Sequence, residues 1–155
     1  MSISHREILG ELSGLLDTPV WITNLANTSA LLNQHLPRLN WVGFYLYDGH
    51  ELVLGPFQGL PACLRIPLGK GVCGTSAEKR ETVVVEDVHK FPGHIACDSR
   101  SNSEIVVPMV KDGRLLGVLD VDSPEFNRFS SEDRVLLENV VRELLARTTF
   151  PEKLI

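Results

Sequence analysis

Residues 104–122, EIVVPMVKDGRLLGVLDVD, contain two short runs of apolar, often branched side chains on either side of Lys111-Asp112-Gly113. Such runs, separated by a turn that contains Asp-Gly, are typical of an antiparallel hairpin. A second pair of runs, NWVGFYLY and ELVLGPF, flanks Asp48-Gly49 in the same way, and ETVVVED at 81–87 is a further candidate strand. The sequence therefore predicts a central antiparallel sheet.

Helical periodicity appears on both sides of these strands. The stretch SISHREILGELSGLLD has apolar residues at helical spacing, and Ser4 with Glu7 fits a capping box at its start. A second helix is expected over 21–36, and a last one begins at Ser130, capped by Ser130 and Asp133. The apolar stripes expected for the first and last helices are Ile8, Leu9, Leu12, Leu15 and Leu16, and Val135, Leu136, Val140, Leu144 and Leu145.

The middle of the chain is expected to be less regular. Residues 55–81 are rich in glycine and proline, which predicts loops with a short helix around Cys73–Glu78. Residues 88–103 form a second irregular stretch. Helices at both ends of a central antiparallel sheet indicate the α+β class. The first and last helices could cover one face of the sheet or supply a dimer contact.

Size and composition limit the class of protein. The 155 residues are 43% hydrophobic and 23% charged, which is typical of a single globular domain, here expected over 1–155. The formal net charge is −5, and without a cluster of Lys and Arg we expect no nucleic-acid partner. The longest apolar runs are far shorter than the ~20 residues of a membrane-spanning helix, so we also expect no membrane segment.

Three cysteines, Cys63, Cys73 and Cys97, each lie in a segment punctuated by Gly or Pro rather than in a hydrophobic run. An odd number cannot pair fully within one chain, and the amino-terminal stretch lacks the residue order of a secretory signal. We therefore expect a reducing, cytoplasmic setting, in which a disulfide is transient and takes part in catalysis.

Two carboxyl groups lie near the end of the last predicted strand. Asp120 and Asp122 share a face because side chains alternate along a strand, and Leu116 and Val118 are expected on that same face. Two acids would then continue an otherwise apolar surface. The alternative is that the strand has already ended and Asp122 only opens a turn.

The turn of the 104–122 hairpin decides whether a third carboxyl joins them. If residues 111–113 form a three-residue loop, Glu104 falls opposite Asp120 and three carboxyls converge. If residues 112–113 alone form the turn, the register shifts by one and Glu104 points to the other face. The sequence leaves both turns open.

Converging carboxyls in an apolar pocket repel one another when ionised, so the pKa of at least one should rise and that group stays protonated near neutrality. A neutral carboxyl can donate a proton to a substrate oxygen, and the remaining charge favours an ammonium group. Trp41 and Tyr45 share a face of the neighbouring strand and offer an aromatic wall for a methyl or thioether group. On residue type alone, core packing is the more common reason for such a pair.

The segment DVHKFPGHIACDSRS concentrates His89, His94, Cys97, Asp98 and Arg100. Such a cluster suits either a metal site or an activated thiol. The spacing of the two histidines and the cysteine matches no standard zinc pattern, so we expect no metal there. A thiolate stabilised by the N–H groups of a turn and by a nearby His or Arg is the interpretation that we adopt.

Four motifs carry a family resemblance: NWVGFYLY, GPFQGLPACLRIPLGKGVCGTSAE, VEDVHKFPGHIACDSRSNSEIVVP and GVLDVDSP. They resemble the GAF-domain free methionine-(R)-sulfoxide reductases and cover residues 40–124 almost continuously. The cysteine spacing, ten positions and then twenty-four, is also that of the family. The resemblance implies a small GAF domain, usually a homodimer, that reduces free L-methionine (R)-S-oxide with thioredoxin as reductant and without a cofactor.

The resemblance also implies roles for single residues. Cys97 is similar to the family's catalytic thiol, and Cys63 and Cys73 are similar to its resolving cysteines. The residues similar to the family's pocket acids are Glu104, Asp120 and Asp122. Those similar to its aromatic wall are Trp41 and Tyr45, and the backbone similar to that which holds the substrate carboxylate is Ile95, Ala96 and Cys97.

These roles imply a cycle of thiol chemistry. The Cys97 thiolate attacks the sulfoxide sulfur, and a neutral carboxyl of Glu104 or Asp122 protonates the departing oxygen. The resulting sulfenic acid condenses with Cys63 or Cys73 to a disulfide, which an external dithiol reduces. A different interpretation is a GAF module that binds a small molecule or senses redox state without catalysis.

Overall fold

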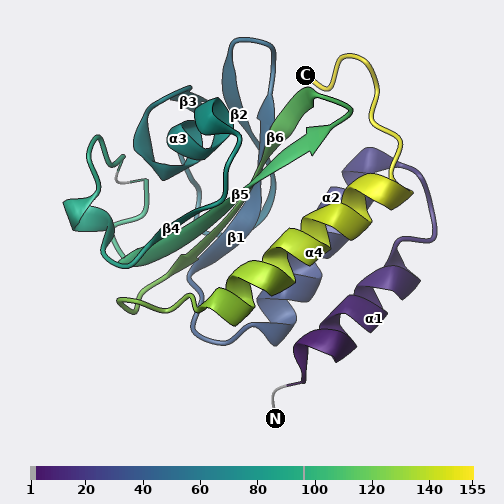
Figure 1. Ribbon diagram of the computed structural model, residues 1–155, viewed down its shortest axis with the longest axis horizontal. Helices are drawn as coiled ribbons and strands as arrows, with labels where there is room; N and C mark the ends of the chain where they lie inside the picture. Colours follow the sequence, from purple (N-terminus) through teal and green to yellow (C-terminus); the bar gives the residue numbers. More distant parts are fainter. Residues whose placement is uncertain (1–2, 96) are drawn as a thin grey trace.

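The computed structural model describes residues 3–95 and 97–155, and it has the α+β architecture predicted from the sequence. In this part of the chain, six strands form one antiparallel sheet in the order β3-β2-β1-β6-β5-β4. Figure 1 shows α1, α2 and α4 together on one side of the sheet and α3 on the other. The strands are β1 Trp41–Tyr47, β2 Glu51–Gly59, β3 Arg65–Pro67, β4 Val83–Val85, β5 Ser103–Lys111 and β6 Arg114–Ser123. The helices are α1 His5–Leu15, α2 Trp21–His35, α3 Gly71–Lys79, the short 3-10 helix η1 Val88–Lys90 and α4 Ser131–Arg147.

Local sequence explains how the terminal helices begin. The Ser4 side chain accepts a hydrogen bond from the Glu7 N–H, and the two residues form the predicted capping box at α1. Ser130 and Asp133 form the same motif at α4. Among the helices of residues 3–95 and 97–155, none combines the length and the apolar character that crossing a bilayer requires.

The buried side of α4 differs from the predicted stripe. Val135, which we expected in that stripe, is 57% exposed. It precedes Leu144 by nine positions, about two and a half helical turns, so the two side chains point in opposite directions. In α1, Leu15 is likewise 39% exposed. The side chains of α4 that do face the core are Leu136, Leu137, Val140, Val141 and Leu144.

Apolar side chains form one cluster on each face of the sheet. The helix-side cluster, beneath α1, α2 and α4, includes Phe44 of β1 and Ile105 of β5. The pocket-side cluster, beneath α3, includes the next residues along the same strands, Tyr45 and Val106. Alternate residues of one strand therefore serve two different cores.

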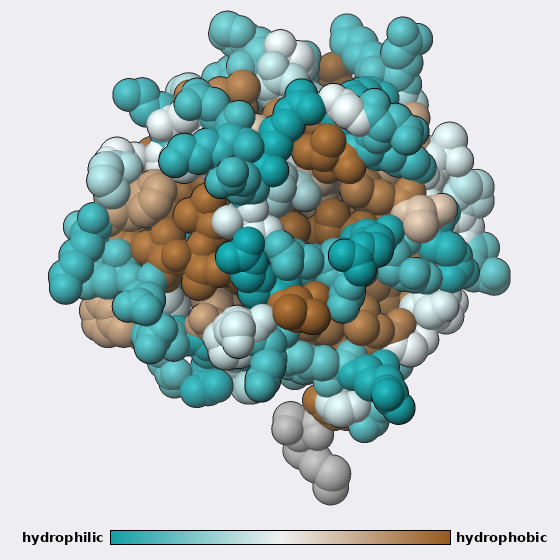
Figure 2. Space-filling model, in the orientation of Figure 1, coloured by the Kyte–Doolittle hydropathy of each residue, from teal (hydrophilic) through white to brown (hydrophobic). Residues whose placement is uncertain are grey.

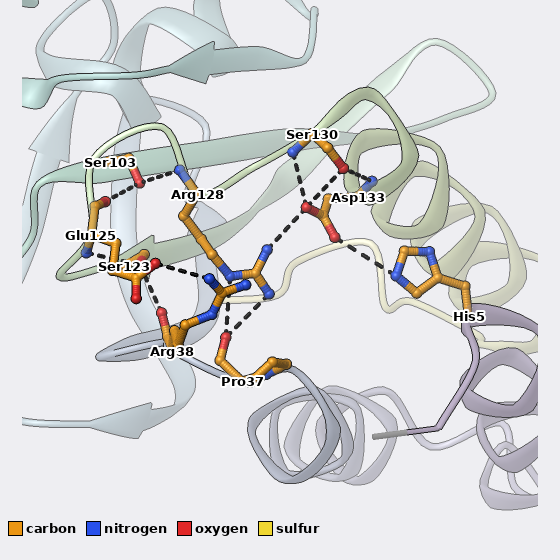
Figure 3. Close-up of polar contacts among 9 residues, drawn as sticks. All are labelled: His5, Pro37, Arg38, Ser103, Ser123, Glu125, Arg128, Ser130 and Asp133. Carbon is orange, nitrogen blue, oxygen red and sulfur yellow. Dashed lines mark hydrogen bonds and ion pairs between the residues drawn. The ribbon is translucent and has the colours of Figure 1, made fainter. Parts of the chain in front are cut away.

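A buried ion pair fastens α4 to one end of the sheet (Figure 3). The Arg128 guanidinium donates to a carboxylate oxygen of Asp133 at 3.0 Å and to the Pro37 carbonyl at 3.1 and 3.2 Å. The Arg128 N–H also donates to Oγ of Ser103, the first residue of β5, at 3.2 Å. This network fixes the strand end from which the next residue, Glu104, enters the pocket-side face.

The turn between β5 and β6 has two residues rather than three. Lys111 pairs with Arg114, which leaves Asp112 and Gly113 as the central residues. Their φ angles are 52° and 76°, the left-handed values that a type I′ turn requires at both positions. The three-residue loop is therefore wrong.

A bulge then changes the register a second time. Val110 pairs with Leu115, but Met109 pairs with Gly117, so Leu116 is the extra residue on β6. A one-residue insertion reverses the faces that the turn alone would set. The prediction that a two-residue turn sends Glu104 to the opposite face is consequently wrong as well.

The bulge decides which side chains meet on the pocket side. Glu104 pairs directly with Asp122 and lies on the same face as Asp120, so the three carboxyls converge as predicted, although through a different turn. Leu116 packs in the helix-side cluster while Val118 packs in the pocket-side cluster. The common face that we predicted for these two residues is therefore wrong.

The glycine-rich middle of the chain is more regular than expected. β2 continues to Gly59, and β3 adds an edge strand over Arg65–Pro67. The expected short helix is present as α3, Gly71–Lys79. The strand predicted at 81–87 contributes only Val83–Val85 to the sheet.

Candidate active site

A pocket lies on the α3 side of the sheet. Its base is formed by β1, β5 and β6, and its walls by α3 and by the segments that contain Ala62 and Cys97. The atom-free space is about 500 Å³, part of which is open to solvent. Ala96, predicted to contact substrate, lies outside the described residues. The other predicted residues that line the pocket are Trp41, Tyr45, Cys73, Ile95, Cys97, Glu104, Asp120 and Asp122.

Three carboxyls form the polar part of the base. Glu104, Asp120 and Asp122 are each more than nine-tenths buried. Within the described residues, the Oδ1 atoms of Asp120 and Asp122 have no hydrogen-bond partner. Burial raises the pKa of Glu104 and of Asp122, and the charge of Asp120 raises both further. The pocket therefore holds at least one carboxyl proton at neutral pH.

Asp120 is the carboxyl that ionises most readily. Burial raises its pKa too, but hydrogen bonds from Glu104, Asp122 and Cys73 act in the opposite direction because they stabilise its charged form. Asp120 is thus the first of the three acids to lose its proton, and Glu104 and Asp122 hold theirs to higher pH. This difference suits a site that binds a cation and donates a proton.

Cys73 lies inside α3 rather than in a loop. It is 4% exposed, and its Sγ donates to Oε2 of Glu104 at 3.8 Å. Burial, followed by the charge of Asp120, raises the pKa of the thiol well above its ordinary value. Such a thiol is neutral near pH 7 and a weak nucleophile.

Cys63 and Cys97 form a disulfide between segments 34 residues apart, with their Cα atoms 5.3 Å from each other. Cys63 belongs to the segment between β2 and β3, and its carbonyl accepts a hydrogen bond from the Tyr45 hydroxyl at 2.9 Å. Cys73 is free. Of the two partners predicted for Cys97, the structure therefore pairs it with Cys63.

An aromatic wall stands beside the carboxyls. The Trp41 ring stacks on Tyr45 with centroids 5.9 Å apart and on Phe57 with centroids 5.1 Å apart. The Trp41 indole N–H donates to the carbonyl of Leu60 at 3.2 Å. Burial, aided by the charge of Asp120, raises the pKa of Tyr45, so its hydroxyl stays neutral. The wall is rigid, apolar and uncharged.

Polar contacts hold the loop that follows Cys97. The Asp98 carboxylate accepts hydrogen bonds from Arg100 at 2.8 Å and from the Asn40 amide at 3.1 Å. The same amide donates to Oγ of Ser101 at 2.9 Å. The hydrogen bond from Arg100 lowers the pKa of Asp98 to about 2, so this carboxylate is charged at neutral pH. Sequence reasoning missed Asn40, because an isolated Asn before a strand gives no signal that a distant loop will contact it.

The two histidines of this region have different surroundings. His94 lines the pocket, and its pKa is lowered by burial and by the neighbouring His89. The rings lie 6.3 Å apart, and Nε2 of His89 lies 2.8 Å from Oδ1 of Asn102. His94 therefore lines the pocket with a ring whose neutral form is favoured, whereas His89 fastens its own loop to the chain just before β5.

Part of the lining was not predicted. Ala62 and Val72 directly precede two of the cysteines, so adjacency to those cysteines was the available signal. Lys70, at the N-cap of α3, brings a cationic side chain to the wall of the pocket. The full set of lining residues missed from the sequence is Ala62, Ile66, Lys70, Gly71, Val72 and Ser101.

Comparison with known proteins agrees with this fold. The family model of the GAF domain matches residues 22–146. A protein of Escherichia coli K12 named free methionine-R-sulfoxide reductase is 54% identical over 80% of the chain and 75% of its own length. A Saccharomyces cerevisiae protein of the same name is 45% identical over 91% of the chain and 86% of its own length.

A solved structure is similarly close. The free methionine-R-sulfoxide reductase of Neisseria meningitidis, in complex with its substrate, superposes with a TM-score of 0.90 and 47% identity. The match covers 95% of this chain and 92% of the other. The chain therefore belongs to the GAF domain family, in the group that contains the free methionine-R-sulfoxide reductases.

Proposed function

We propose that this chain reduces free L-methionine (R)-S-oxide to L-methionine by thiol chemistry. It is an oxidoreductase. The relatives that are 54% and 45% identical to it are both named free methionine-R-sulfoxide reductase. One observation carries the proposal: a single pocket is lined by Cys97, which pairs with Cys63 in a disulfide, by buried carboxyls whose pKa is raised, and by an aromatic wall.

The first step uses Cys97 and a protonated carboxyl. The Cys97 thiolate attacks the sulfoxide sulfur, the S–O bond breaks, and the oxygen is transferred to Cys97 as a sulfenic acid. The sulfur of the substrate is reduced to a thioether while the cysteine sulfur is oxidised. Glu104 or Asp122 supplies the proton that the oxygen needs, because burial and repulsion keep these groups protonated.

The second step regenerates the enzyme. The Cys63 thiolate attacks the sulfur of the Cys97 sulfenic acid, and a disulfide forms. The displaced hydroxide is protonated and leaves as water. The 5.3 Å between the Cα atoms supports Cys63 as the resolving thiol. Cys73, with its raised pKa, is the weaker candidate. An external dithiol then reduces the disulfide by exchange, and we propose thioredoxin for this role.

The pocket offers a complementary group for each part of a free amino acid. Asp120, the readily ionised carboxyl, pairs with the ammonium group. Trp41 and Tyr45 hold the methyl and thioether carbons against their rings. Backbone N–H groups around Ile95 and Cys97 are proposed to bind the carboxylate. A methionine within a polypeptide lacks both charged groups, which explains selectivity for the free form.

We further propose that the protein acts in the cytoplasm without a cofactor, as one GAF domain over residues 1–155, and that two copies associate. Support for association comes from α4 and α1, which expose Val135 and Leu15. Figure 2 shows apolar side chains among charged ones on the face where α4 lies. Sedimentation equilibrium of wild type against Val135→Glu tests this, and a monomeric wild type contradicts it.

Epimer-resolved turnover tests the proposed activity. The reduced protein is incubated with free methionine sulfoxide of mixed configuration and dithiothreitol, and the remaining epimers are separated by chromatography. We expect consumption of the R epimer alone, with the Cys97→Ser variant as matched control. N-acetyl methionine sulfoxide amide, which lacks both charges, should remain unreduced. Survival of the free R epimer with the wild-type protein contradicts the proposal.

A further inference from the structure

Three side chains at the base of the pocket are also arranged as ligands for a metal ion. Cys73 of α3, Glu104 of β5 and Asp120 of β6 each offer one donor atom, and these three atoms all lie within 4.8 Å of one another. The Cys73 Sγ and Glu104 Oε2 atoms are 3.8 Å apart. A tetrahedral zinc ion with bonds of about 2.3 Å to sulfur and 2.0 Å to oxygen separates these donors by about 3.5 Å. The sulfur and oxygen therefore already stand close to zinc-binding distance.

Two buried carboxyl oxygens at this site have no hydrogen-bond partner among the described residues and are free to bind a cation. Asp120 and Asp122 line the pocket, are over nine-tenths buried, and have Oδ1 atoms without a hydrogen-bond partner among the described residues. Within residues 3–95 and 97–155, no ion pair joins Glu104, Asp120 or Asp122 to a basic side chain. Buried acids without a counter-charge carry a large desolvation cost, which a bound cation offsets.

We propose that Zn²⁺ binds at Cys73, Glu104 and Asp120 and reversibly blocks the pocket. A thiolate with two carboxylates favours a borderline-soft ion over Mg²⁺ or Ca²⁺, which prefer oxygen alone. Three protein ligands leave a fourth position for water or for Asp122. On binding, the thiol and each protonated carboxyl release their protons to solvent, and no oxidation or reduction occurs.

Such an ion excludes substrate in two ways. It occupies Asp120, the proposed partner of the ammonium group, and it holds Glu104 without the proton that the sulfoxide oxygen requires. Zinc affinity should increase with pH, because the thiol and the carboxyls must lose their protons when they bind the ion. The other titratable groups that line the pocket are Tyr45 of β1, Lys70 at the N-cap of α3, Asp122 of β6, and His94 and Asp98 of the loop around Cys97.

The oxidised protein gives a direct test, because its disulfide occupies Cys63 and Cys97 and leaves Cys73 as the free thiol. Co²⁺ is titrated into this form as a spectroscopic substitute for zinc. We expect one equivalent to bind with a thiolate-to-cobalt charge-transfer band in the near ultraviolet, and Zn²⁺ to abolish the band by displacement. The experiment needs no turnover, so its outcome is independent of the proposed activity.

Variants locate the ligands. Cys73→Ser should remove the charge-transfer band, and Asp120→Asn should weaken cobalt binding at least tenfold. The matched control is the double variant Cys63→Ser with Cys97→Ser, which retains all three proposed ligands and should retain the band. Should Cys73→Ser fail to fold, alkylation of Cys73 by iodoacetamide in the oxidised wild type replaces it, with zinc expected to slow the reaction. A wild type without the band, a band that survives Cys73→Ser, or alkylation unaffected by zinc overturns the proposal.

Discussion

The two faces of the central sheet use the same strands for opposite purposes. On β5, Ile105 enters the helix-side cluster while its neighbour Glu104 enters the pocket. On β6, Val121 and Asp122 divide in the same way. The helix side is an apolar core, whereas the pocket side buries three acids and a thiol among its apolar residues. One face therefore stabilises the fold, and the stability that it contributes allows the other face to hold groups that are costly to bury.

The largest effect is expected from Cys97→Ser, a pocket-side substitution that should abolish activity and leave stability almost unchanged. The attacking sulfur is lost, so reduction of the free sulfoxide should become undetectable, while the midpoint of thermal unfolding of the reduced protein changes little. Chromatographic assay of methionine, beside a melting curve under reducing conditions, measures both effects. Cys63→Ser is the control, since it should still release one methionine per enzyme in a single turnover. Full activity of Cys97→Ser with dithiothreitol would refute the assignment.

A substitution on the helix side of the sheet should have the opposite effect, because it lowers stability and leaves activity intact. Leu144→Ala removes a fully buried side chain and should lower the free energy of unfolding by about 3 kcal/mol. The fraction that remains folded should keep its kcat, because this residue does not reach the pocket. Arg142→Ala on the same helix is the control and should be nearly neutral, since Arg142 is exposed. Urea unfolding measures both, and equal losses for the two variants contradict the packing described for α4.

A substitution of Glu104 on the pocket side should have a smaller effect, because it removes only the proton that this side chain can release. Glu104→Gln keeps a hydrogen-bond donor but cannot release its proton, so kcat should fall by ~10²-fold while KM changes less. Steady-state kinetics at several pH values measures this loss. Glu81→Gln, at an exposed site just after α3, is the control. An unchanged kcat assigns the proton transfer to Asp122.

Burial of the acids should also appear in the pH dependence of stability. The pKa of Asp122 is higher in the folded than in the unfolded chain, so the stability present at low pH is lost as pH rises through the folded value. Asp122→Asn should therefore raise the free energy of unfolding at pH 8, because the variant does not carry the cost of burying a charged carboxylate. Near pH 3 the variant and wild type should coincide. Urea unfolding at both pH values decides, and a destabilised variant at pH 8 contradicts the proposed burial cost.

The smallest expected effect concerns Asp98. Its charge is a minor contributor to the raised pKa of Asp122, after burial and Asp120. If Asp122 is the proton donor, activity falls as pH rises through that pKa, and Asp98→Asn should move this descending limb to lower pH by less than about one unit. The pH profile of kcat measures the shift. Asp17→Asn, an exposed control, should leave the profile in place, and a shift to higher pH contradicts the argument.

Alternation and turn signals predicted the strands of the two hairpins and the strand that contains β4, but not the edge strand β3 and not the register. Residues 112–113 explain the turn locally, whereas the bulge at Leu116 depends on a contact between strands. Gly117 follows the bulge, and a Cβ at this position would overlap the carbonyl oxygen of Tyr45 on β1. Nothing near residue 117 in the sequence indicates that Tyr45 will be its neighbour.

The same limit applies to the site. Residue chemistry predicted a redox role for the cysteines, but it left the convergence of the three carboxyls dependent on the turn and left Cys63 and Cys73 equivalent as partners of Cys97. Their difference is tertiary, because α3 encloses Cys73 while the segment between β2 and β3 brings Cys63 to Cys97. Long-range contacts, which carry no local signature, explain most of what sequence reasoning missed.

The disulfide has a consequence for the lifetime of the protein. It closes a covalent ring over the 34-residue separation between Cys63 and Cys97, a ring that contains α3 and β4. Closing a ring of this length restricts the unfolded chain by about 4 kcal/mol in chain-entropy terms. Molecules that await their reductant are thus harder for a protease to open than molecules ready for substrate. Degradation should therefore fall mainly on the reduced form, and the supply of reducing equivalents helps to set how long each copy survives.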